Sequence, residues 1–385
     1  MNLGTLKIRQ KLILYILPLI ILPSVIISLI VLNQLSQNVT QSVKREEQIH
    51  IEDQKAQIEN LLQIPLQDIR YLHEIPAVEQ FAQGLASGDA LAIEEARIFL
   101  VDDFLALADT RRIYAELRFI DADGFEQVRV EYNPFDNTIY NVPTEGLQNK
   151  ADRPYFTGTM SLPDGGLYIS PLDLRREGTP PTIYIQPDGS VMPFIRYGTP
   201  IYFGNRLMGM VIINFLAQEV LNLVEPNGAD GYAYLLNTDG YFLANTRIPT
   251  RTFGFENGIE AIGNERGANL SNSAFFNDQE QRRVLAVGIN SLDEFSVDAG
   301  QLIHAVRINI APENSFFNYY MILMASREES VIYSGLQQIT ILGFALIGAV
   351  ALAGTILTIF IARQISRPIG ELGKEKKKLA TGDFN

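Results

Sequence analysis

Two long apolar runs, one toward each end, constrain the fold of this 385-residue chain more than any other feature. Leu12 to Leu32 is 21 residues without a charge, and Val331 to Ala362 is 32 residues without a charge. About 20 apolar residues in a helix span the hydrocarbon core of a bilayer. We therefore predict transmembrane helices at residues 12–32 and 332–362. A cleaved signal peptide is the alternative for the first run, but that run is long and no small-residue cleavage site follows it.

Basic residues flank the two runs on their outer sides. Three precede the first run and six follow the second: Lys7, Arg9, Lys11, Arg363, Arg367, Lys374, Lys376, Lys377 and Lys378. Basic flanks stay in the cytoplasm. We expect a two-pass membrane protein with residues 1–11 and 363–385 cytoplasmic and residues 34–330 exported.

Charge and composition exclude several functions. The chain has a net charge of −13, and its ends hold nine of 31 basic and three of 44 acidic residues, which leaves the exported segment at −19. Such an acidic segment argues against a nucleic-acid partner. The absence of cysteine excludes disulfides, thiolate metal sites and a cysteine nucleophile. The three histidines lack metal-ligand spacing and no catalytic motif is present, so we predict no cofactor, no metal and no catalytic residue, and leave enzymatic activity open.

Residues 34–72 read as one long helix because they are polar and nearly free of Gly and Pro. Apolar residues at 4-3 spacing form a seam along it: Ile51, Ile58, Leu62, Ile69 and Leu72. The seam can pack on its own domain or on a second subunit, and a few heptads do not separate these alternatives.

Short alternating segments with Asp-Gly and Pro-Asp-Gly turns follow a further helical stretch at residues 77–108. They form two clusters, 112–215 and 231–326, separated by a short helix at 216–224. The last candidate strands are 284–289, 302–310 and 319–325. Asp121–Gly124 reads as a hairpin turn and not as a calcium loop, because the loop's bidentate Glu is missing. We predict an α+β fold in which a stalk and helices (34–110) precede two antiparallel-sheet modules (111–225 and 226–328) in series.

Three stretches resemble the double Cache (dCache, PAS-like) sensor of bacterial transmembrane receptors. They are residues 117–129, residues 147–156 continuing at 168–174, and residues 195–200 with 209–214. The resemblance implies two tandem PAS-like modules flanked by membrane helices, in the bacterial inner (plasma) membrane with a periplasmic or extracellular sensor. Residues 363–385 resemble the start of a HAMP linker, which joins a membrane helix to an output such as a histidine kinase, a nucleotide cyclase or a chemoreceptor domain.

The resemblance also implies a ligand site in the first, membrane-distal module. Its predicted residues are Arg153, Tyr155, Phe156, Tyr168, Ser170, Asp173 and Asn214. Arg153 suits a carboxylate because a guanidinium forks onto planar anions. Gln148, Ser170 and Asn214 stand where amino-acid sensors of this family carry a Tyr and two acidic residues. We therefore expect a small anion or a neutral polar molecule and not a standard amino acid. Arg153 has a structural alternative as a partner of Asp152 or Asp173, and Asp173 has one as a turn residue.

We predict the sensory part of a signal-transduction receptor that binds a small extracytoplasmic molecule and passes a conformational change through the second membrane helix. A protein-binding or adhesion module is the alternative, and an extracytoplasmic enzyme is disfavoured by the missing motifs. We also expect a parallel homodimer. The HAMP-like seam cannot bury its apolar positions alone, and small residues would let the second membrane helices approach: Gly343, Gly348, Ala349 and Gly354.

Overall fold

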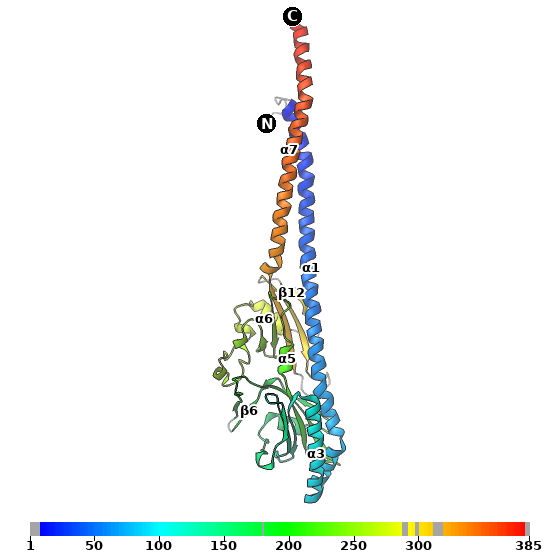
Figure 1. The fold of residues 1–385 in the computed structure, drawn as a ribbon, viewed down its shortest axis with the longest axis vertical. Coiled ribbons are helices and arrows are strands. Elements are labelled where there is room, and N and C mark those ends of the chain that lie inside the picture. Colours follow the sequence, from blue (N-terminus) through cyan, green and yellow to red (C-terminus); the bar gives the residue numbers. More distant parts are fainter. Residues whose placement is uncertain (1–7, 179–180, 287–291, 297–299, 311–318, 382–385) are drawn as a thin grey trace. The chain divides into compact units, whose positions relative to one another are not determined.

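The computed structural model describes residues 8–178, 181–286, 292–296, 300–310 and 319–381. It divides into two compact units, residues 1–45 with 329–385, and residues 46–328. The helices are α1 (Ile8–Glu74), α2 (Pro76–Ser87), α3 (Ala90–Arg111), α4 (Pro154–Met160), α5 (Gln218–Asn222), α6 (Asp278–Leu285) and α7 (Glu329–Thr381). These long helices and the antiparallel sheets below confirm the predicted α+β fold class (Figure 1).

The first unit consists of the beginning of α1 and all of α7. Leu17–Glu74 within α1 and Ser330–Ile365 within α7 contain stretches long and apolar enough to cross a membrane. Within this unit the two helices touch. The hydroxyls of Thr40 and Tyr333 are 3.2 Å apart, and a side chain at Gly343 would meet Leu32. The two predicted membrane segments are therefore helical and in contact.

The second unit holds two separate larger sheets and a small third one. The first sheet has seven antiparallel strands in the order β3-β2-β1-β9-β8-β4, with β5 also pairing β8. Its strands are β1 (Tyr114–Asp121), β2 (Glu126–Asn133), β3 (Thr138–Asn141), β4 (Tyr168–Ile169), β5 (Asp173–Leu174), β8 (Pro193–Phe203) and β9 (Arg206–Leu216). The small sheet pairs β6 (Arg176–Glu177) with β7 (Thr182–Ile183). The predicted turn after Asp121 joins β1 to β2, with Gly124 at φ 89°, a conformation that favours glycine.

The second sheet has five antiparallel strands in the order β11-β10-β14-β13-β12. They are β10 (Gly231–Leu236), β11 (Phe242–Asn245), β12 (Leu292–Ser296), β13 (Gln301–Asn309) and β14 (Tyr320–Glu328). Its last strand, β14, runs directly into α7 in the sequence. This sheet reaches the second predicted membrane segment without an intervening loop.

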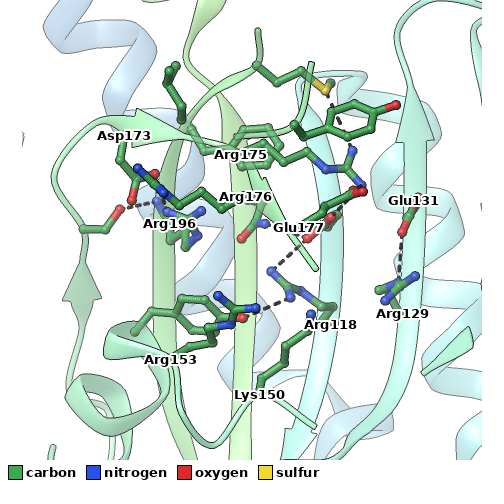
Figure 2. A pocket seen from close by; sticks show the side chains of 18 of the residues that line it. Arg118, Arg129, Glu131, Lys150, Arg153, Asp173, Arg175, Arg176, Glu177 and Arg196 are labelled. Carbon is green, nitrogen blue, oxygen red and sulfur yellow. Dashed lines mark hydrogen bonds and ion pairs between the residues drawn. The ribbon is translucent and has the colours of Figure 1, made fainter. Parts of the chain in front are cut away.

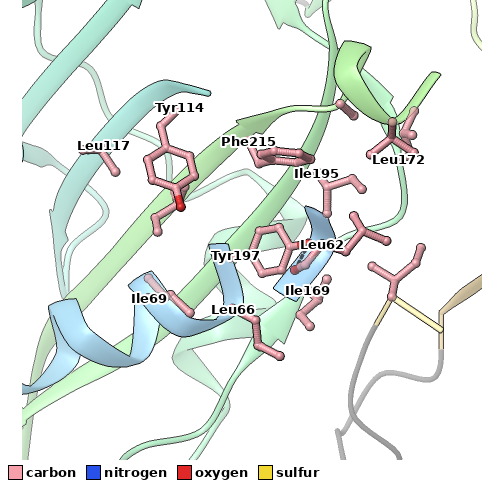
Figure 3. Close-up of a cluster of buried hydrophobic side chains, with 14 of the residues drawn as sticks. Leu62, Leu66, Ile69, Tyr114, Leu117, Ile169, Leu172, Ile195, Tyr197 and Phe215 are labelled. Atoms are coloured by element: carbon pink, nitrogen blue, oxygen red, sulfur yellow. Dashed lines mark hydrogen bonds between the residues drawn. The ribbon is translucent and has the colours of Figure 1, made fainter. Parts of the chain in front are cut away.

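The apolar seam of α1 packs on its own domain. Ile51, Ile58, Leu62, Ile69 and Leu72 are all fully buried within the single chain. Figure 3 shows Leu62, Leu66 and Ile69 against side chains from the first sheet, among them Tyr197 and Phe215. Burying each such side chain contributes about 1.5–3 kcal/mol. Of the two alternatives for this seam, packing on a second subunit is wrong.

The prediction of a strand at residues 284–289 is wrong for its first two residues. Val284 and Leu285 end helix α6, and residues 287–289 lie outside the described part of the chain. The helix forms because Asn277 caps it: the Asn277 side chain accepts from the Glu280 amide, and the Glu280 side chain accepts from the Asn277 amide. This capping box fixes the first turn, so local hydrogen bonding outweighs the apolar pattern that favoured a strand.

Candidate functional site

The first sheet has one apolar face and one polar face, because successive side chains on a strand alternate. Leu117 on β1, Tyr197 on β8 and Phe215 on β9 belong to the buried apolar core, in which α1 also takes part. Their neighbours Arg118, Arg196 and Asn214 face the other way, into a cavity of about 890 Å³. Strand alternation alone therefore places a row of polar side chains in this cavity.

Strand register sets these polar side chains side by side. Glu116 lies opposite Glu131 on one neighbouring strand and opposite Asn214 on the other, and Asn214 lies opposite Arg196. Arg118 and Arg129 form the adjacent row. Alternating rows of acid and base produce a network of ion pairs across the sheet.

The network is tightly paired (Figure 2). Arg118 lies 2.8 Å from Glu116 and 3.1 Å from Glu126, and Arg129 lies 2.9 Å from both Glu126 and Glu131. Further pairs close the cavity wall: Arg175 with Glu177 at 2.6 Å and with Glu116 at 3.4 Å, and Arg196 with Asp173 at 2.5 Å. Glu116, Arg118 and Glu126 are nearly inaccessible to solvent. Buried charges of this kind are tolerated only when they are paired.

Residues 147–153 form another part of the wall, held by the β1–β2 hairpin. The Gln148 amide donates to the Glu126 carboxylate at 3.0 Å, and the Lys150 amide donates to the Gly124 carbonyl at 2.7 Å. A side chain at Gly124 would strike Ala151 at 2.5 Å, so glycine permits this close approach. The segment brings Lys150 and Arg153 to the cavity just before α4 begins at Pro154.

These two cations are less well neutralised than the others. Lys150 donates to the Gln148 amide oxygen at 2.6 Å and makes no ion pair within the described residues. Arg153 lies 3.5 Å from Asp152, whose side chain is 72% exposed. Burial and the nearby Arg118 lower the pKa of Lys150 below its usual value. This end of the cavity therefore holds positive charge that the chain does not fully compensate.

The structure brings six of the seven predicted site residues to the cavity: Arg153, Tyr155, Tyr168, Ser170, Asp173 and Asn214. Phe156 does not line the cavity; it is buried beside it, in an apolar cluster that also includes Tyr155 and Tyr168. The binding role of each of these residues stays a prediction.

Several of the predicted polar groups already have partners in the chain. The Ser170 hydroxyl accepts from the Arg196 amide at 2.9 Å and donates to the Pro171 carbonyl at 2.8 Å. Asn214 donates to Glu116 at 2.6 Å, and Asp173 accepts from Arg196. These three side chains hold the wall together, whatever they contribute to a ligand.

Sequence reasoning did not select most of the cavity's charged residues. Glu116, Arg118, Arg129, Lys150, Arg175 and Arg196 all line it. The available signal was the run of charges on predicted strands, since a charge there must pair or face water. The sequence did not show which charged or polar side chains pair with one another. Glu116 and Asn214, for example, are 98 positions apart, and only the β1–β9 register brings them together.

No group of three or more metal-ligating His, Cys, Asp or Glu side chains occurs among the residues that the structure describes. The acidic side chains of the cavity are engaged with arginines instead. The chemistry that this site offers is therefore recognition of polar or charged groups by hydrogen bonds and ion pairs.

Comparisons with known proteins agree with a sensory role. Residues 90–273 match the family model of the bacterial histidine kinase sensor domain. That range contains the whole first sheet and every residue that lines the cavity except Tyr319. The match confirms the predicted bacterial sensor domain. No curated protein sequence matches the chain.

Solved structures share the fold at low sequence identity. An extracellular domain assigned to a histidine kinase, vpHK1S-Z8, matches with a TM-score of 0.59 and 17% identity, over 77% of this chain and 95% of that chain. A domain of a sensory box/GGDEF family protein from Vibrio parahaemolyticus matches with a TM-score of 0.58 and 16% identity, over 78% and 99%. A weaker match is the sensory domain of the Campylobacter jejuni chemoreceptor Tlp3 with isoleucine bound. Its TM-score is 0.46 and its sequence identity 9%, over 78% of this chain and 98% of that chain.

Proposed function

We propose that this chain, whose residues 90–273 form a sensor domain of the bacterial histidine kinase type, detects a small extracytoplasmic molecule in the cavity of the first sheet. The observation that carries this proposal is the 890 Å³ cavity itself, which is lined by converging charged and aromatic side chains inside the matched range. Ligand sites are typically concave, within this range of volumes, and contain a few well-placed polar groups.

The charge distribution favours an anion over a zwitterionic amino acid. Glu116, Glu131 and Asp173, three carboxylates of the cavity wall, are each paired with an arginine. An ammonium group would have to displace one of those pairs. Lys150 and Arg153, in contrast, can accept an added negative charge without breaking a buried ion pair. A small carboxylate therefore fits the cavity better than an α-amino acid.

The test is thermal unfolding of the full chain in detergent, with acetate, lactate, succinate, benzoate, L-alanine and L-serine as probes. A molecule that binds only the folded state raises the midpoint. We expect at least one carboxylate to do so and the two amino acids to have no effect. Lys150→Gln should weaken that binding about tenfold or more, because it removes a charged hydrogen-bond donor. Lys55→Gln, on the α1 helix, is the matched control and should change nothing.

Two outcomes contradict different parts of the proposal. If an amino acid stabilises the chain and no carboxylate does, the anion preference is wrong but the sensor remains. If no small molecule from a wider metabolite panel shifts the midpoint, detection of a small molecule is wrong and a protein-binding module becomes the better explanation.

For signal transmission, we propose a two-pass protein of the inner membrane with both ends in the cytoplasm, as the basic flanks suggest. Ligand binding would favour one of two packings of the sensor domain, and the second membrane helix would carry the difference to a HAMP-like segment at 363–385. The direct passage of β14 into α7 supports this route. A ligand acts only if its affinity differs between the two packings.

We further propose that the membrane helices form a parallel homodimer. Gly348 on α7 has open space around it, whereas Gly343 faces Leu32 of the same chain. In this cysteine-free protein, a single cysteine at position 348 should crosslink between chains in native membranes, and one at 343 should crosslink much less. Equal crosslinking along residues 340–360, or none with the protein present and folded, would rule out this helix pairing.

A further inference from the structure

The short segment Asp173–Glu177 connects the cavity to another part of the domain. Asp173 and Arg175 belong to the cavity wall: Asp173 accepts from Arg196 at 2.5 Å, and Arg175 lies 2.6 Å from Glu177 and 3.4 Å from Glu116. An occupant of the cavity would therefore act directly on this segment. Leu174 and Arg176 of the same segment also border the cavity, but both bind a residue that does not line it.

Leu174 and Arg176 bind one carboxylate. The Leu174 amide donates to one oxygen of Glu256 at 3.1 Å, and the Arg176 guanidinium pairs with the other oxygen. Glu256 is only 5% exposed and lies 82 positions further along the chain. Leu174 is fully buried in an apolar cluster that also contains Phe253 and Ile259, which flank Glu256.

Glu256 belongs to the loop that follows β11 of the second sheet. The Phe253 amide donates to the Phe242 carbonyl on β11 at 2.8 Å, and the Glu256 amide donates to the Phe253 carbonyl at 2.9 Å. The sheet order β11-β10-β14 then leads to the strand that continues into α7. A contiguous series of hydrogen-bonded elements thus joins the cavity wall to the start of α7.

We propose that Glu256 is a positioning residue that makes the second sheet respond to the occupancy of the cavity; this rests on the proposed sensor function. A buried carboxylate is costly to leave without its partners. When an occupant shifts Asp173–Glu177, Glu256 and its loop must follow the Leu174 amide and the Arg176 guanidinium. The apolar contacts alone would allow the segment to slide, whereas the two charged hydrogen bonds fix its register.

The test is amide hydrogen exchange of the full chain in detergent, without ligand, on segments 172–177 and 253–259. Glu256→Gln should speed exchange of 172–177 about tenfold, since it removes the charge that holds both donors. Asp173→Asn, on the cavity side, should in turn speed exchange of 253–259. The matched control is Glu177→Gln, because Glu177 is 47% exposed and pairs with Arg175 in the same segment. It should leave 253–259 unchanged.

If Asp173→Asn leaves 253–259 unchanged, Glu256 is only a local structural residue and the inference is wrong, whether or not a ligand is found. If Glu256→Gln speeds exchange across the whole domain, that variant unfolds too much to test the inference, and Arg176→Gln is used instead. The Arg176→Gln substitution leaves the hydrogen bond from the Leu174 amide to Glu256 intact. That variant should speed exchange of 172–177 and 253–259 only, by a smaller factor. Unchanged protection there would overturn the inference.

Discussion

Replacing Asp68 with alanine is expected to lower the free energy of unfolding by about 2–3 kcal/mol, because the buried Tyr114 hydroxyl loses its acceptor and Arg111, which is 39% exposed, loses a charged partner that water replaces only in part. Asp68 lies on α1 and is 5% exposed. It accepts from Arg111 through Nε at 2.7 Å and Nη2 at 2.8 Å, and it also accepts from the Tyr114 hydroxyl. Without the carboxylate, the guanidinium loses its two charged bonds and the buried hydroxyl loses its acceptor.

A matched control separates burial from charge. Asp109→Ala removes the partner of Arg112 at 2.5 Å, but the two side chains are 64% and 43% exposed. Exposed pairs contribute at most about 1 kcal/mol. Urea unfolding followed by near-UV circular dichroism of the 16 tyrosines gives both values in this tryptophan-free chain. Equal unfolding midpoints for the two variants would show that Asp68 does not anchor α1 to the end of α3 and the start of β1.

Much of the fold could be predicted because it rests on local signals. Charge-free runs of more than 20 residues, the Asp123-Gly124 turn and the alternation along 113–119 each act within a few residues. The seam from Ile51 to Leu72 was also visible, but its partner was not. Helical spacing shows only that a face is apolar, and the first sheet that covers it lies far along the chain.

The site was only partly predictable, for a related reason. The stretch 147–156 was recognisable, and it brings Arg153 and Tyr155 to the cavity. The ion pairs that shape the cavity depend on strand register between distant segments, such as β1 with β9. Phe156 and the adjacent Tyr155 belong to the same apolar cluster, but only Tyr155 also lines the cavity, because successive residues of α4 point in different directions. The role of Glu256 could not be predicted from the sequence, because Leu174 and Arg176 contact it only in the folded chain.

Glu116→Gln is expected to destabilise the protein by about 3 kcal/mol at neutral pH, and this difference should shrink as the pH falls. Burial alone would raise the pKa of Glu116, but Arg118 and Arg175 outweigh burial and hold the pKa at about 2, against an ordinary value of 4.5. Each pKa unit corresponds to about 1.4 kcal/mol of stability. Because the folded-state pKa is depressed, this stability is fully present above pH 4.5 and is lost as the pH falls toward 2.

The measurement compares wild type and Glu116→Gln by urea unfolding between pH 7 and pH 3. Their difference should be constant down to about pH 5 and then decrease, because the wild type takes up a proton that glutamine cannot. Glu177→Gln removes the exposed carboxylate on the same Arg175, and should cost less than about 1 kcal/mol throughout. A pH-independent difference for Glu116 would mean that its carboxylate is not held ionised by the arginines. The cavity would then lack the paired charge network on which the proposed preference for anions depends.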